Sequence, residues 1–375
     1  MNTIGWTGTL FAIVLCALTG CGSEVPPPPA ADAARAAQQA TAFIEAIKPR
    51  REGKPVIAVV ARNEGTEITD FLLTHAVLQR ADIADVHAVA PRSGRVSLYP
   101  ALQVEVAQDL ATFDQTYPAG ADYVIVPAMS DNTDGAILAW LKQQSDQGAR
   151  IIGICAGGLV VGNAGLLDHR RFTTHWYYLD ELREHHPAAV YVPHQRYVID
   201  SNIATTTGIT ASVPTMLALI EAIGGPEKAQ SLAADFGVAS WTPVHDSSQF
   251  GLNFSRGFSY IVNKLAFWRD NEMRVDVVDG MDDITLAFTA DAWSRTGHIK
   301  VQATAPAPVK LRSGLTLLPD PAADNATPLP LTAELKPMEQ LDRTLCDIGS
   351  RFGAARREWV MMELEYPGQP ACGAE

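Results

Sequence analysis

Residues 150–167 read RIIGICAGGLVVGNAGLL, and the junction inside this stretch decides the fold. The preceding run, ARIIGI at 149–154, is short and apolar, which is typical of a buried strand. The run LVVGNAGLL at 159–167 predicts a short helix. Cys155 stands at the junction, followed at once by Ala-Gly-Gly. The thiol is therefore either an inert core group or a nucleophile held at the turn.

A strand that turns at once into a helix points the turn residue out of the sheet edge, and small residues must follow because the backbone folds back closely. Ala156, Gly157 and Gly158 meet that need. The helix start directs free N–H groups and its positive dipole end at the thiol, so we expect the pKa of Cys155 to lie below its usual value of about 8.5. The N–H of Ala156 is an expected donor to an oxyanion.

Outward from this stretch, short apolar runs alternate with amphipathic ones. A hairpin is expected around 94–106, a strand pair at 197–208 and one long helix at 212–237. The other expected strands are 55–61, 85–91 and 121–128, and the other expected helices are 68–81 and 134–148. The alternation predicts a mostly parallel, flavodoxin-like doubly wound sheet with helices on both faces. Cys155 then lies at the carboxyl edge, where such sheets bind ligands.

The composition excludes some classes of function. The 375 residues are 47% hydrophobic and 19% charged, as in globular proteins. A net charge of −13 argues against a nucleic-acid partner, which needs a basic face. The five cysteines form no C-x-x-C pair, and we assign His185, His186 and His194 to a solvated surface. We therefore expect no metal and no cofactor.

The first residues do not belong to the predicted fold. An apolar run at 10–18 has the length of a signal-peptide core, and Leu18-Thr19-Gly20-Cys21 resembles the lipobox of bacterial lipoproteins. No Lys or Arg precedes this run, so a plain N-terminal anchor is the alternative. We expect a signal peptide at 1–20, lipidation of Cys21, a Pro/Ala-rich tether and helix at 21–53, and a place in the bacterial cell envelope.

The motif GICAGG at 153–158, followed by AGLLDHRRFTTHW at 164–176, resembles the ThiJ/PfpI superfamily of class I glutamine amidotransferase-like proteins. The resemblance covers about 54–245 and is strongest to sensor-type domains of AraC-family regulators and to isocyanide hydratases. It implies that Asp70 lies beside Cys155 and that His175 lies near the thiol. Asp70 could instead be a first-turn helix acid, and His175 a packed structural histidine.

The sequence departs from the family at three places. Ala128 and Met129 replace a Gly-Gly pair, so the N–H of Met129 becomes the second expected oxyanion donor. Ala156 replaces the histidine of the protease-like branch, which puts peptidase activity in doubt. Residues 246–375 show no helix-turn-helix pattern, which disfavours transcriptional control.

Residues 246–375 contain a weak repeat of the earlier sequence. The stretch 279–319 aligns with 64–106 so that Gly65 meets Gly280, and 341–367 is similar to the long helix near Leu217. This indicates a smaller, degenerate half-domain that packs on the first and does no chemistry; chance similarity is the alternative. A disulfide between Cys346 and Cys372 stays open at this point.

Together these features predict an exported cysteine-dependent hydrolase or hydratase that acts on a small electrophilic molecule. The alternative is a lipoprotein that binds or senses a small molecule, or that uses Cys155 as a redox switch. The expected partners are a small-molecule ligand and a membrane reached through Cys21, with a homodimer left open.

Overall fold

The computed structural model describes residues 33–251, 271–321 and 326–372. The predicted signal peptide and Cys21 lie outside the described residues. Within those ranges, no helix is both long and apolar enough to cross a membrane.

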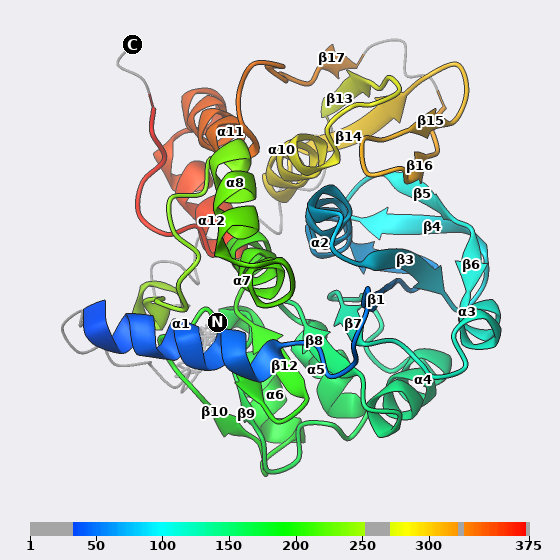
Figure 1. The fold of residues 1–375 in the computed structure, drawn as a ribbon. Coiled ribbons are helices and arrows are strands. Elements are labelled where there is room, and N and C mark those ends of the chain that lie inside the picture. Colours follow the sequence, from blue (N-terminus) through cyan, green and yellow to red (C-terminus); the bar gives the residue numbers. More distant parts are fainter. Residues whose placement is uncertain (1–32, 252–270, 322–325, 373–375) are drawn as a thin grey trace, which may run out of the picture.

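A seven-stranded sheet forms the centre of the fold, in the order β11-β12-β8-β7-β1-β3-β6 (Figure 1). Only the β11–β12 pair is antiparallel, which confirms the predicted, mostly parallel α/β sheet. The strands are β1 (Val56–Val60), β3 (Asp85–Ala90), β6 (Gln108–Asp109), β7 (Tyr123–Val126), β8 (Arg150–Gly153), β11 (Tyr197–Asp200) and β12 (Ile203–Thr206).

Helices cover both faces of this sheet, and strand periodicity separates the two cores. In β1, Ile57 and Val59 join the core beneath α2 and α7, whereas Ala58 and Val60 join the core beneath α4 and α5. Successive side chains of a strand point to opposite faces, so an all-apolar strand feeds both cores. The helices of residues 33–251 are α1 (Ala33–Ile47), α2 (Ile68–Ala81), α3 (Leu110–Thr116), α4 (Gly135–Asp146), α5 (Gly157–Asn163), α6 (Leu179–His185), α7 (Ser212–Gly224) and α8 (Pro226–Phe236).

The long helix predicted at 212–237 is in fact two helices, so that prediction was wrong. Gly225 separates α7 from α8 with φ 89° and ψ 165°, and Pro226 then begins the second helix. A glycine adopts this positive φ without steric cost, and proline cannot continue the hydrogen bonding of a preceding helix.

A second, five-stranded sheet joins the two parts of the chain, in the order β15-β16-β5-β4-β2. The predicted hairpin is present as β4 (Gly94–Tyr99) and β5 (Gln103–Val106). Strand β16 (Thr316–Leu317), from the C-terminal part, pairs antiparallel with β5. The remaining strands are β2 (Glu64–Glu67), β15 (Val309–Lys310), and the separate pair β9 (Arg171–Phe172) and β10 (Val190–Tyr191).

The C-terminal part repeats elements of the first. Strand β13, helix α10 and strand β14 come in the same order as β1, α2 and β3, although β2 lies between β1 and α2, and both strand pairs are parallel. Helices α11 and α12 repeat α7 and α8, with Gly353 between them at φ 88° and ψ 165°. The elements are β13 (Asn271–Asp276), α10 (Asp283–Arg295), β14 (Ile299–Thr304), β17 (Thr327–Pro328), α11 (Pro337–Phe352) and α12 (Ala354–Leu364).

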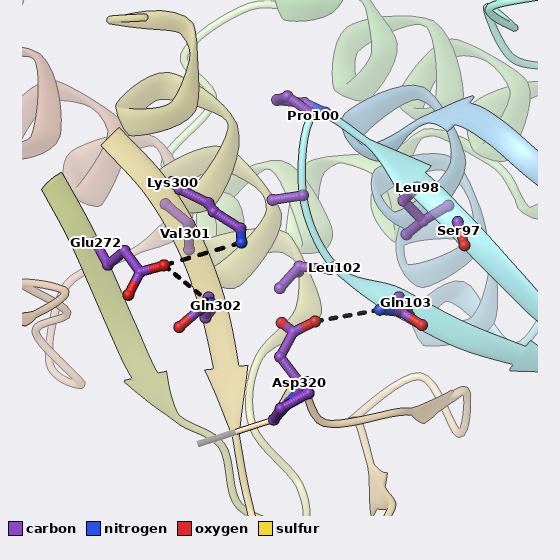
Figure 2. Close-up of a pocket in the computed structure, with 12 residues that line it drawn as sticks. Ser97, Leu98, Pro100, Leu102, Gln103, Glu272, Lys300, Val301, Gln302 and Asp320 are labelled. Carbon is purple, nitrogen blue, oxygen red and sulfur yellow. Dashed lines mark hydrogen bonds and ion pairs between the residues drawn. The ribbon is translucent and has the colours of Figure 1, made fainter. Parts of the chain in front are cut away.

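The two parts pack closely along a seam. Helices α2 and α10 lie side by side in the shared core (Figure 1). A cavity of about 570 Å³ lies farther along the seam, where the side-chain amide of Gln103 donates to the Asp320 carboxylate at 3.2 Å (Figure 2). The predicted boundary at residue 245 stays a prediction.

A disulfide joins Cys346 of α11 to Cys372. The disulfide fixes the segment that follows α12 to helix α11.

Candidate active site

Cys155 lies in the turn between β8 and α5 with φ 55°, a conformation that non-glycine residues rarely adopt. Two threonines hold its backbone there. The N–H of Cys155 donates to Thr206 Oγ1 at 3.0 Å, and its carbonyl accepts from Thr174 Oγ1 at 3.1 Å. A strained residue persists only where its surroundings fix it, and such residues gather at functional sites.

The glycine two positions later is required by close packing. A Cβ on Gly157 would lie 2.0 Å from the carbonyl oxygen of Val126, at the end of the neighbouring strand. Only glycine lets the start of α5 come this close to β7. The small residues after the cysteine therefore have the steric role that the sequence predicted for them.

Cys155 lines a cavity of about 770 Å³. Cys155 is 5% exposed, and it is the free cysteine of the described residues. Residues of both parts of the chain line this cavity, and the expectation that the C-terminal part does no chemistry stays a prediction. Its lining includes Glu67, Tyr99, Met129, Ala156, His175, Trp176, Tyr177, Tyr178, Arg295, Lys300, Arg356, Trp359 and Glu363.

Asp70 is fully buried on α2, near the cysteine but not in hydrogen-bond contact with it. Its Oδ2 accepts from the Ala128 N–H at 3.0 Å, and within the described residues its Oδ1 has no hydrogen-bond partner. Burial raises the pKa of Asp70 well above its usual value, and the neighbouring Glu67 charge adds to that rise. Asp70 thus holds the loop before Met129, and its carboxyl makes no hydrogen bond to the sulfur.

The pKa of Cys155 moves opposite to our expectation. Burial raises it well above the ordinary thiol value, and the charges of Asp70, Glu67 and Glu365 act in the same direction. The Ala156 N–H acts against them but does not prevail. Desolvation by burial outweighs the one peptide dipole, which favours the neutral thiol of Cys155.

The two expected oxyanion donors both line the cavity. Met129 forms an isolated bridge with Thr66, flanked by hydrogen bonds from Glu67 N to Ala128 O and from Ser130 N to Gly65 O, both at 2.8 Å. Its own N–H takes part in neither of these bonds. Gly65 permits this approach, because a Cβ there would lie 2.0 Å from Ser130 Oγ. Ala156 and Met129 thus line the same cavity as Cys155.

His175 is held by backbone groups at both ring nitrogens. Its Nε2 lies 2.9 Å from the carbonyl oxygen of Glu363, and its Nδ1 accepts from the Tyr177 N–H at 3.2 Å. Burial lowers the pKa of His175 to about 4. This arrangement favours a packed, neutral histidine over a general base.

Of the two acids at the start of α2, Glu67 lines the cavity and Asp70 does not; the sequence reasoning missed Glu67. Glu67 caps α2: its Oε2 accepts from Asp70 N at 2.7 Å and from Thr69 Oγ1 at 2.6 Å. Its Oε1 lies 2.7 Å from Nη2 of Arg295. The spacing of Glu67 and Asp70 on one helix turn was a signal, but only the fold shows which acid reaches the cavity.

Glu365, which follows α12, also holds the Thr174-His175-Trp176 motif in place. Glu365 is buried, with φ 50°, and its two carboxyl oxygens accept from Trp176 N at 2.7 Å and Gly208 N at 2.8 Å. Burial raises the pKa of Glu365 to about 7. His245 Nε2 lies 3.4 Å from this carboxyl, but burial lowers the pKa of His245 to about 3, so the imidazole is neutral.

The histidines considered as metal ligands lie apart from this site. His186 contacts the Asn163 side chain at 3.1 Å, and His194 accepts from Ser247 N at 3.3 Å. In the described residues, no group of His, Cys, Asp and Glu side chains is arranged to hold a metal ion.

Comparison with known proteins finds that residues 55–222 match the DJ-1/PfpI family. The isonitrile hydratase of Pseudomonas putida is 34% identical over 132 residues, which cover 35% of this chain and 54% of that protein. The HTH-type transcriptional regulator CdhR of Pseudomonas aeruginosa is 33% identical over 124 residues, covering 33% of this chain and 37% of the regulator. The matched part thus spans about half or less of these relatives' lengths.

Among solved structures, Drosophila melanogaster DJ-1beta is similar with 23% identity and a TM-score of 0.44, over 50% of this chain and 100% of that chain. A ThiJ/PfpI family protein of Pseudomonas syringae gives the same identity and TM-score, over 50% of this chain and 76% of that chain.

Proposed function

Since residues 55–222 form a DJ-1/PfpI family domain, we propose that this chain is a cysteine-dependent hydratase or hydrolase for a small electrophilic molecule. One observation carries the proposal. Cys155 is held at a strained strand–helix turn on the wall of a cavity that is also lined by an acid, Glu67, and by the two expected oxyanion donors, Ala156 and Met129. These are the parts that nucleophilic catalysis requires.

The residues suggest a specific order of bond changes. The Glu67 carboxylate takes the thiol proton as the sulfur forms a bond to an electrophilic carbon of the substrate. Glu67 then gives that proton to the atom made basic by the addition, while the N–H groups of Ala156 and Met129 stabilise developing negative charge. Water adds to the same carbon, the C–S bond breaks, and the sulfur regains a proton. The net change is addition of water, or displacement when the carbon carries a leaving group.

The cavity favours a small substrate. Its volume of about 770 Å³ falls within the range of sites for single small molecules, and aromatic side chains line much of it. An isonitrile, a carbonyl compound or an amide has the electrophilic carbon that this chemistry needs. The isonitrile hydratase relative makes the first of these the natural starting point for a screen.

A second candidate is a binding or sensing module that uses the same cavity without turnover. The observation that favours it is the raised pKa of the Cys155 thiol, because a neutral thiol is a weaker nucleophile than a thiolate. In that case the cavity would bind the same class of molecule, and no product would form.

A turnover screen over isonitriles, dicarbonyls and small amides separates the two functions. Cys155→Ala and Cys155→Ser should abolish any turnover, and Glu67→Gln should reduce it by about a hundredfold or more. Asp70→Asn is the matched comparison, because it alters the neighbouring acid that does not line the cavity. Unchanged turnover in the Cys155 variants would end the enzyme proposal. Saturable binding without product would support the sensing module.

We also propose that the chain is exported and anchored in the cell envelope through a lipid on Cys21. The Cys346–Cys372 disulfide supports an oxidising compartment. Mass spectrometry of the membrane fraction should find a lipidated N-terminal Cys21, and Cys21→Ser should release the protein from that fraction. A homodimer stays a prediction, which analytical ultracentrifugation would test.

A further inference from the structure

The two parts of the chain meet through reciprocal ion pairs. Arg80, in the last turn of α2, lies 2.8 Å from Asp282, the residue that caps α10. Arg295, at the end of α10, lies 2.7 Å from Glu67, the residue that caps α2. Arg295 follows Arg80 in the sequence by the same number of positions by which Asp282 follows Glu67.

This reciprocity is the mark of an isologous contact, in which residue i of one copy meets j of the other and j meets i. It adds side-chain detail to the repeated order of strands and helices, and it makes chance similarity of the two stretches a poor explanation. The C-terminal part therefore packs on the first as a reduced second copy of it would.

The two ends of this contact differ in what lies beside them. The Arg295 end lines the cavity of Cys155, whereas Arg80 is not among the residues that line it. Between β16 and α11, the described residues contain β17 alone, so they hold no counterpart of β8 and the cysteine turn. The Arg295–Glu67 pair thus lies at the cavity of Cys155, whereas the chemically similar Arg80–Asp282 pair lies away from that cavity.

The Arg295 guanidinium is fixed on all sides. Its Nε lies 2.7 Å from Asp291, its Nη2 lies 2.7 Å from Glu67, and its Nη1 lies 3.4 Å from Glu363. The side chain is 13% exposed. A buried carboxylate needs a charged, hydrogen-bonded partner, and Arg295 supplies one to Glu67 on the cavity wall.

We infer that Arg295 is a positioning residue for the Cys155 site, supplied by the degenerate second copy, and that it acts by holding the Glu67 carboxylate toward the cavity. The inference rests on the proposed function, because it assigns Arg295 a part in that site. The titratable and charged groups around the Arg295–Glu67 pair are Asp70 on α2, Asp291 on α10, Glu363 on α12, Tyr99 at the end of β4, and His175, Tyr178 and Cys155 at the cavity.

The test measures the alkylation of Cys155 by iodoacetamide as a function of pH in the intact protein, with the modified site mapped by mass spectrometry. Arg295→Gln should move the midpoint upward by about one pH unit, because Glu67 is left without its cation and disfavours the thiolate. Arg80→Gln is the matched control: it removes the equivalent pair from the same helix contact and should leave the midpoint within about 0.2 unit. Circular dichroism checks that both variants fold.

A double-variant cycle tests whether Arg295 acts through Glu67. In a Glu67→Gln background, Arg295→Gln should shift the midpoint by less than half of its effect in the natural chain. If Arg295→Gln does not fold, Arg295→Lys replaces it. The lysine keeps the positive charge but loses the planar, paired N–H donors of the guanidinium, so the midpoint should shift upward by less.

Equal midpoints in the Arg295 and Arg80 variants, or a full Arg295 effect without Glu67, would overturn the inference. Because alkylation needs no substrate, this result does not depend on whether turnover is found.

Discussion

The backbone N–H of Cys155 donates to the side chain of Thr206, on the adjacent strand β12, at 3.0 Å. Thr206 is fully buried, and its hydroxyl donates a hydrogen bond to the carbonyl oxygen of Thr207 at 2.9 Å. The strained turn is therefore anchored to the sheet by one hydroxyl group.

Thr206→Val should lower the free energy of unfolding by about 1–3 kcal/mol, because the buried N–H of Cys155 loses its acceptor while the side-chain volume is nearly kept. Urea unfolding measures this. Thr116→Val, at an exposed helix position, is the control and should change stability by less than about 0.5 kcal/mol. Equal effects of the two changes would show that the hydroxyl does not anchor the turn.

Gly157→Ala should destabilise the fold by about 3 kcal/mol or more, because the new methyl group would meet the Val126 carbonyl, a backbone atom that cannot move aside. Gly135→Ala, at the start of α4, meets nothing within 4 Å and should stabilise the protein by about 0.5–1 kcal/mol. Thermal unfolding compares the two variants. The steric account requires their effects to have opposite signs.

Glu365 should make stability fall as the pH rises from 4.5 to about 7. Its folded pKa is raised to about 7 from the ordinary 4.5, so over this range the native state holds a proton that the unfolded chain releases. Its share of the loss is about 3 kcal/mol. Urea unfolding at several pH values should show that Glu365→Gln removes this share, whereas the exposed Glu358→Gln should keep the natural slope. A natural slope in Glu365→Gln would contradict the assignment.

His175→Gln should leave the pH midpoint of Cys155 alkylation within about 0.3 unit, because a histidine with a pKa of about 4 is already neutral above pH 5. The loss of its two backbone hydrogen bonds should still cost about 1–3 kcal/mol of stability. Alkylation and urea unfolding on the same sample test both statements. A midpoint shift of a full unit would restore His175 as a partner of the thiol.

Local pattern predicted much of the fold. The helix 68–81 and the strands around it follow from apolar runs of the right length, and the Cys-Ala-Gly-Gly junction located the turn between β8 and α5 that carries Cys155. The motif resemblance led to the family, which the match over 55–222 confirms. The helix 212–237 was predicted as continuous because the helical spacing of its apolar residues continues past Gly225. The Gly225-Pro226 pair nevertheless indicated two helices.

The site was harder to predict because tertiary contacts assemble it. Thr206, Glu67 and Arg295 are distant in sequence from Cys155, and no local spacing connects them. The direction of the thiol pKa was wrong for the same reason. The sequence predicts the peptide dipoles at a helix start. It does not predict how deeply the thiol is buried, nor that carboxyl groups of α2 and of the end of α12 lie near it, because these exist only in the folded chain.

The covalent link between the two parts of the chain has a consequence for how the cavity responds to dilution. When separate subunits build a site between them, the fraction of complete sites falls as their concentration drops toward the dissociation constant. Here the second contributor is part of the same polypeptide, so its effective concentration is fixed by the chain. The wall that carries Arg295 should remain in place in a single molecule, however far apart the molecules are.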